Sequence, residues 1–212
     1  QNRIIINKAE IAEDTDSSGN PVDDQDSASS KWTDGEDDQD IEQLYEKYFD
    51  LALKLNIQNI STIKDGIETI NPANLQNPKE TIRIEKNKNE LENTVYKIQY
   101  LITILNQGEI PGYATEIIDY VPTGLKFNPA DNPKWKMIEG RLVNKELKND
   151  IINPGESKTT TITLTWSEET ENSKMMSNVA EIGQAANNSN TPDINSTPNN
   201  NNDKENDQDN SD

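Results

Sequence analysis

The residues best suited to chemistry in this sequence are closely spaced oxygen donors near its start. The candidate metal ligands are Asp14, Asp16, Ser18, Asn20, Asp23 and Asp24. Oxygen donors at alternate positions, with glycine at the sixth position (Gly19), are typical of the start of a calcium loop. The twelfth position is Gln25 instead of a bidentate acid, so the EF-hand pattern is broken. A calcium site and a solvated linker both remain open, and the composition favours the linker.

Groups that commonly perform acid–base or nucleophilic catalysis are missing from the sequence. The 212 residues include no histidine and no cysteine, which removes the usual general base near neutral pH and every thiolate. Adjacent acids, such as Glu168 and Glu169, point to opposite faces of a strand, whereas glycoside hydrolysis needs two carboxylates across a cleft. No glycine-rich phosphate loop or serine nucleophile elbow occurs. The sequence predicts no catalysis and no cofactor, with calcium as the one candidate.

The chain is strongly acidic, and its charge is unevenly distributed. The formal net charge is −19, and hydrophobic residues make up 31%. Twelve acids and one base lie within residues 10–40, six acids and one base lie within 187–212, and the segment 41–186 has a net charge of only −5. No basic stripe is available for nucleic acid, and no apolar run is long enough to cross a membrane. We expect no nucleic-acid partner and no membrane insertion within this segment.

Apolar residues at alternate positions predict several strands. The clearest cases are 51–57, 94–105 and 159–166, and shorter candidates are 80–85, 113–121, 124–127, 134–138, 141–147 and 174–182. Turn signals rich in Gly, Pro and Asn separate these segments. A short helix is an alternative over 40–48, where apolar residues are helically spaced. Many short strands separated by such turn signals predict an all-β fold, an Ig-like antiparallel β-sandwich with disordered acidic flanks.

The two ends of the chain share a composition and a short echo. Residues 187–212 hold ten asparagines and a single aliphatic residue, Ile194, and residues 12–40 are similarly polar. Such segments bury too little apolar surface to become ordered. The stretch Asn7-Lys8-Ala9-Glu10-Ile11 recurs as Asn178-Val179-Ala180-Glu181-Ile182, and a polar, acidic stretch follows each copy. The echo indicates a repeat protein.

The echo and the composition divide the chain into four parts. We expect residues 1–30 to be the last strand and tail of a preceding repeat, 31–44 an acidic linker, 45–184 the sandwich repeat, and 185–212 a disordered Asn/Asp-rich linker. The chain opens at Gln1, without a methionine or signal peptide. We therefore expect a segment of a longer protein, with neighbouring repeats of the same chain as its partners.

Four elements, in order along about 48–183, carry a resemblance to a known family. They are Val95-Tyr96-Lys97-Ile98 through Asn106-Gln107-Gly108, Ala114 through Ile118-Asp119-Tyr120-Val121-Pro122-Thr123-Gly124-Leu125-Lys126-Phe127, Pro154-Gly155-Glu156-Ser157, and Asn178 through Ile182. The sequence thereby resembles the bacterial conserved repeat domain, the domain of unknown function numbered eleven. The resemblance implies an Ig-like sandwich, usually in tandem, on secreted or wall-anchored proteins of Gram-positive type, and no catalysis. The expected localisation is extracellular, at the cell surface or in the cell wall.

The resemblance also raises the question of whether this chain forms a Lys–Asn isopeptide bond. Some surface repeats of related architecture lock their first and last strands in this way, with a buried acid as catalyst. Asn178 is suitably placed on the last strand, and Glu116 or Asp119 is the candidate acid. Family members often carry the lysine where this chain has Leu55, and strand alternation turns Lys54 to the opposite face. We therefore expect no crosslink here, and local hydrogen bonding by Asn178.

Two functions remain open at this point. The first is a structural spacer or stalk repeat of a cell-surface or secreted protein. The alternative is an adhesion module that binds a host glycan or protein, with calcium in the acidic linker as a variant of either. Trp135 and Trp166 are candidate sugar-stacking residues. Trp166 ends an alternating apolar face and is expected in the core, whereas Trp135 follows no pattern.

Overall fold

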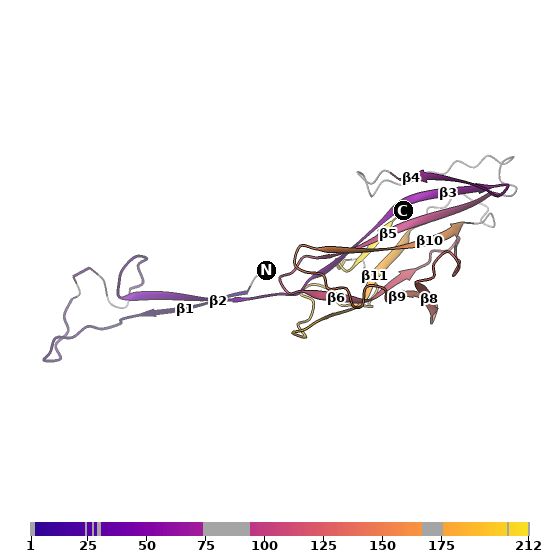
Figure 1. Cartoon of the computed structure of the whole chain (residues 1–212). Helices are drawn as coiled ribbons and strands as arrows, with labels where there is room; N and C mark the ends of the chain where they lie inside the picture. Colours follow the sequence, from indigo (N-terminus) through magenta and orange to yellow (C-terminus); the bar gives the residue numbers. More distant parts are fainter. Residues whose placement is uncertain are drawn as a thin grey trace. The chain divides into compact units, whose positions relative to one another are not determined.

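The chain folds into two separate units made of β-strands. The computed structural model describes residues 3–23, 25–26, 28, 31–73, 94–166, 176–202 and 204–211, which form strands β1 to β12 and no helix. The first unit is Gln1–Lys47 and the second is Tyr48–Asp212 (Figure 1). Nothing in these ranges forms a helix that could span a membrane.

The first unit is a two-stranded antiparallel ribbon. β1 (Arg3–Glu10) pairs with β2 (Gln39–Glu46), from Arg3↔Glu46 to Glu10↔Gln39. The helix considered over 40–48 is therefore wrong, and the expected linker 31–44 ends in a strand from Gln39. The reason is that β1 provides a backbone hydrogen-bonding partner along all of β2. A helix there would have only a short apolar stripe to bury.

The second unit is a sandwich of two antiparallel sheets. In the first sheet, the order is β4-β3-β5-β10-β7, with β3 Leu51–Lys64, β4 Ile67–Pro72, β5 Thr94–Asn106, β7 Leu125–Phe127 and β10 Ser157–Trp166. In the second sheet, the order is β12-β11-β6-β9-β8, with β6 Gly112–Tyr120, β8 Trp135–Ile138, β9 Arg141–Asn144, β11 Asn178–Asn187 and β12 Gln208–Ser211. The expected all-β sandwich is confirmed.

Alternation along the strands builds the core between the sheets. On β5, Ile98, Tyr100, Ile102 and Ile104 are buried, while the residues between them remain partly exposed. β3 and β10 bury alternate apolar residues in the same way. The strands predicted at 51–57, 94–105 and 159–166 are confirmed, and the shorter predictions at 113–121, 124–127, 134–138, 141–147 and 174–182 correspond to β6, β7, β8, β9 and β11. The prediction at 80–85, residues 174 and 175, Glu168 and Glu169 lie outside the described residues.

Two glycines between the end of β5 and the start of β6 are required by close packing against residues 48–50. A Cβ on Gly108 would lie 2.6 Å from the backbone nitrogen of Asp50, and a Cβ on Gly112 would lie 2.3 Å from the ring of Phe49. Neither glycine has a positive φ, so close packing and not a left-handed backbone requires glycine at these two positions. Gly124 does turn the chain before β7 with a φ of 108°.

The C-terminal segment lies along the edge of β3 that β4 leaves uncovered. β11 continues to Asn187, and Asp207 is buried. Three alternate amides of β3 donate to this segment: Leu51 N to Asp193 Oδ2 at 2.8 Å, Leu53 N to the Asn206 carbonyl at 2.8 Å, and Leu55 N to Asp209 Oδ2 at 3.1 Å. The structure differs here from the disordered linker expected over 185–212. The C-terminal segment is ordered by polar groups that accept hydrogen bonds from β3. A pattern of hydrophobic residues cannot reveal such contacts.

The first and last parts of the second unit run in the same direction. Phe49 and Asp193 form a parallel bridge, and the Ile194 amide donates to the Phe49 carbonyl at 3.0 Å. Residue numbers increase in the same direction along both segments, because Phe49 pairs with Asp193 and Leu55 contacts Asp209. The beginning of β3 and the C-terminal segment are therefore parallel neighbours.

Candidate functional site

A buried acid–amide pair joins β6 to β11. Asp119 and Asn178 are both 0% exposed. The Asn178 side-chain amide donates to Asp119 Oδ2 at 2.7 Å, which confirms the local hydrogen bond expected for Asn178. Burial raises the pKa of Asp119 to about 7, and the bond from Asn178 opposes this rise. The remaining oxygens, Asp119 Oδ1 and Asn178 Oδ1, have no hydrogen-bond partner among the described residues.

The pair sits at the position considered for an isopeptide crosslink. Of the two candidate acids, Asp119 contacts Asn178, whereas Glu116 forms an ion pair with Lys145 at 2.8 Å. Leu55 is buried and Lys54 is exposed, as strand alternation predicts. Because Asp119 accepts from the amide nitrogen, the bond holds the Asn178 side chain in place and does not activate its carbonyl group.

Five of the six candidate calcium ligands lie in the described part of a short loop, where Asp16 accepts hydrogen bonds from its own neighbours. Asp16 Oδ1 accepts from the backbone amides of Ser18 at 2.8 Å and Asn20 at 2.9 Å, and the Asn20 side chain donates to Asp16 Oδ2 at 3.1 Å. These bonds lower the pKa of Asp16, with the Asn20 amide as the main cause. Gly19 closes the turn with a φ of 80°.

The other candidate ligands are spread along the same loop. The backbone carbonyl of Asp14 accepts from the Val22 amide at 3.1 Å, and Asp23 is exposed. Asp24 lies outside the described residues. No group of three or more acids within the described ranges is arranged to hold a metal ion. Calcium binding at this loop stays a prediction.

A second group of acids surrounds Asp207 in the other unit. Asp207 is 2% exposed, and neither carboxylate oxygen has a hydrogen-bond partner in another described residue. Burial raises the pKa of Asp207 to about 7, and the charges of Glu181, Glu205 and Asp193 raise it further. Glu181 is itself held by the Tyr120 hydroxyl at 2.7 Å. Asp207 therefore takes up a proton near neutral pH.

The hairpin of the first unit has a counterpart in the second unit. The sequence echo extends beyond the first stretch, because Glu36-Asp37-Asp38-Gln39-Asp40 matches Glu205-Asn206-Asp207-Gln208-Asp209. Inspection of the sequence misses this second match because the loop before it is two residues longer in the first copy. In both copies the second stretch returns along the first.

The two hairpins have the same register. Ala9 faces Asp40 and Glu10 faces Gln39, just as Ala180 faces Asp209 and Glu181 faces Gln208. The next hydrogen bond is also the same: the Ile11 amide donates to the Asp38 carbonyl at 2.9 Å, and the Ile182 amide donates to the Asp207 carbonyl at 2.8 Å. The shared sequence thus encodes a shared hairpin.

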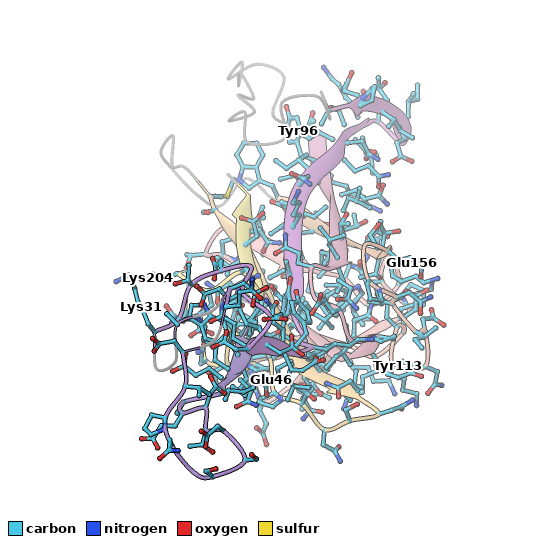
Figure 2. The ribbon with its side chains drawn as sticks, turned by 90° about the vertical axis from the view of Figure 1, so that its left-hand side faces the viewer. Lys31, Glu46, Tyr96, Tyr113, Glu156 and Lys204 are labelled. Atoms are coloured by element: carbon cyan, nitrogen blue, oxygen red, sulfur yellow. The ribbon has the colours of Figure 1, made fainter. Side chains whose placement is uncertain are left out.

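The two candidate sugar-stacking tryptophans are buried. Trp135 is 3% exposed, and its indole donates to the Thr161 carbonyl at 2.8 Å. Trp166 is 8% exposed, and its ring lies 5.1 Å from that of Tyr96, which Figure 2 labels on β5. Trp166 belongs to the core as expected, and Trp135 joins it.

No family model matches the chain, and no curated protein matches it significantly.

Proposed function

We propose that this chain is a non-catalytic spacer repeat, with Ig-like modules, of an extracellular surface protein. The parallel arrangement of the first and last segments of the second unit carries the proposal. Tension applied at its two ends slides these segments past each other. The bonds at Leu51, Leu53 and Leu55 then bear load together and do not open one after another.

Other features support the same function. The resemblance to the bacterial conserved repeat domain implies tandem modules on the surface of Gram-positive bacteria. The repeated hairpin is the pattern expected of such an array. Negative charge keeps neighbouring modules soluble and apart. Partners are then the neighbouring repeats of the same chain.

Force spectroscopy on the full chain tests this proposal. The sequence contains no cysteine, so introduced cysteines give unique attachment points. With handles at Lys47 and the C-terminus, the second unit is pulled in shear. With handles at Lys47 and Asn190, the Phe49–Asp193 end is peeled open. We expect a clearly higher unfolding force in the first geometry. Equal forces in both geometries contradict a load-bearing spacer.

An adhesion module makes a different prediction. The buried positions of Trp135 and Trp166 remove the aromatic surface that suggested a glycan site. Labelled full chain is applied to arrays of host glycans and extracellular-matrix proteins. A spacer gives no saturable binding. Saturable binding that excess unlabelled chain competes away assigns the adhesion function instead.

A further inference from the structure

We propose that the β1–β2 hairpin is a closing hairpin that docks on a second copy of the sandwich body formed by residues 48–177. This inference rests on the proposed tandem arrangement and specifies how one repeat connects to the next. The hairpin takes the place that β11 and β12 occupy on the body in this chain. The partner is therefore a body of the same type, located before the hairpin in a longer chain or in another molecule.

The two hairpins are equivalent in sequence and register, but they differ in solvent exposure. Ile11 is 52% exposed, whereas its counterpart Ile182 is 1% exposed. Ala9 is exposed, whereas Ala180 is 0% exposed. Ile4, Ile5 and Ile6 on β1 are each at least 50% exposed. An isolated two-stranded ribbon is at best marginally stable in water, so this apolar surface needs a body to pack on.

The unpaired edge of β1 corresponds to the edge of β11 that binds β6. β11 lies between β12 and β6, whereas β1 pairs with β2 alone within the described residues. In the register of β11, Ala180 faces Asp119 and Ile182 faces Ile117. Docked in the same way, Ala9 faces Asp119 of the second copy. Asn7 then takes the position of Asn178 and donates to that buried acid.

β2 and the residues just before it carry the counterparts of the groups that cover the β3 edge. Asp209 accepts from the Leu55 amide, and the Asn206 carbonyl accepts from the Leu53 amide. Their counterparts in the first hairpin are Asp40 and Asp37. One hairpin thus provides both the strand that pairs with β6 and the acceptors that cover β3. Only residues 47–50 separate the end of β2 from the start of β3.

One position differs between the two hairpins at a point of close packing. Gly183 follows Ile182, and a Cβ on it would lie 2.6 Å from the Cδ1 atom of Ile118. The counterpart of Gly183 is Ala12. The end of the Ile118 side chain must move to admit Ala12. The substitution Ala12→Gly should therefore strengthen docking on this body.

The test adds a second body to the full chain. Residues 48–177 are fused ahead of Asn7, so that residues 7–46 are the only closing hairpin available to the added body. We expect two folded bodies, and hydrogen exchange of the β1 amides at least about tenfold slower than in the full chain alone. A12G should raise the melting temperature of the added body only.

Matched variants separate docking from a general folding failure. Ala9→Asp in the two-body chain should abolish the transition of the added body, because the charge enters its core. The same A9D substitution in the full chain, where Ala9 is exposed, should leave the melt unchanged. A control chain gives the added body its own residues 178–211 before Asn7.

The outcomes distinguish the two proposals. If the control chain folds both bodies and the hairpin-only chain folds one, the docking inference is overturned. Unchanged exchange of β1 in a folded two-body chain also overturns it. Neither result bears on the force measurement, which tests the spacer function alone. If the hairpin docks but the unfolding forces in the two pulling geometries are equal, this inference holds and the proposed spacer function is contradicted.

Discussion

The side-chain amide of Asn178 on β11 donates a 2.7 Å hydrogen bond to the fully buried carboxyl group of Asp119 on β6. This contact ties the last long strand of the sandwich to its neighbour within the core. It also places an ionisable group where water cannot solvate its charge.

The first prediction concerns pH. The pKa of Asp119 is about 7 in the folded protein, against an ordinary value of 3.8. The folded state therefore binds more protons between these values, and stability falls as pH rises from about 4 to about 7. This group contributes at most about 1.4 kcal/mol per pH unit. Denaturant melts across this range should show a smaller decline in D119N, whereas D16N in the exposed loop should match the wild type.

The second prediction concerns the amide partner. Asn178→Ala removes the hydrogen bond that opposes the raised pKa of Asp119. We expect a loss of about 1–3 kcal/mol in unfolding free energy near neutral pH, and a pH dependence that extends to higher pH. Asn188 is exposed on the turn after β11, so N188A is the control. A neutral effect of N178A shows that the contact is not used in solution.

The third prediction concerns the C-terminal segment. Asp193→Ala removes the acceptor of the Leu51 amide, and we expect a loss of about 1–3 kcal/mol. Truncation after Asn187 removes all three acceptors of the β3 edge and should cost more. Ser189→Ala, on an exposed side chain, should change little. If the truncated chain is as stable as the full chain, the prediction is contradicted and the C-terminal segment is the disordered linker expected from composition.

The fourth prediction concerns close packing at glycine. A Cβ at Gly108 meets the backbone of Asp50, which cannot rotate away. Thermal melts of Gly108→Ala should show a destabilisation of about 1–3 kcal/mol or more. Gly155 has a φ of 78° and open space around it, so G155N, with a residue that tolerates this conformation, should cost less.

The fifth prediction concerns covalent and metal chemistry. The intact mass should equal the mass calculated from the sequence. The family resemblance implies a crosslinking lysine at position 55, and this chain has Leu55 there. A mass lower by one ammonia contradicts this.

Melts of the full chain with calcium and with chelator test the loop at Asp14–Asn20, because a ligand of the folded state raises stability. A shift that D16N removes assigns calcium to the loop.

Alternation was sufficient to predict most of the sandwich, because the β5 residues from Ile98 to Ile104 report burial directly through their spacing. The candidate acid could be narrowed only to Glu116 or Asp119. Choosing between them requires the pairing of β6 with β11, which depends on a bulge near Gln184. The prediction failed where polar groups organise the chain. Asp193 and Asp209 order the C-terminal segment by accepting from backbone amides, and no hydrophobicity pattern records that role.

The acceptors along β3 also govern the behaviour of the protein at high concentration. The amides of Leu51, Leu53 and Leu55 belong to an apolar strand whose edge would otherwise be open to strands of other molecules. The asparagine- and aspartate-rich tail occupies that edge. Proteolytic loss of the tail should therefore turn a highly charged protein into one that associates through β3, long before its core unfolds.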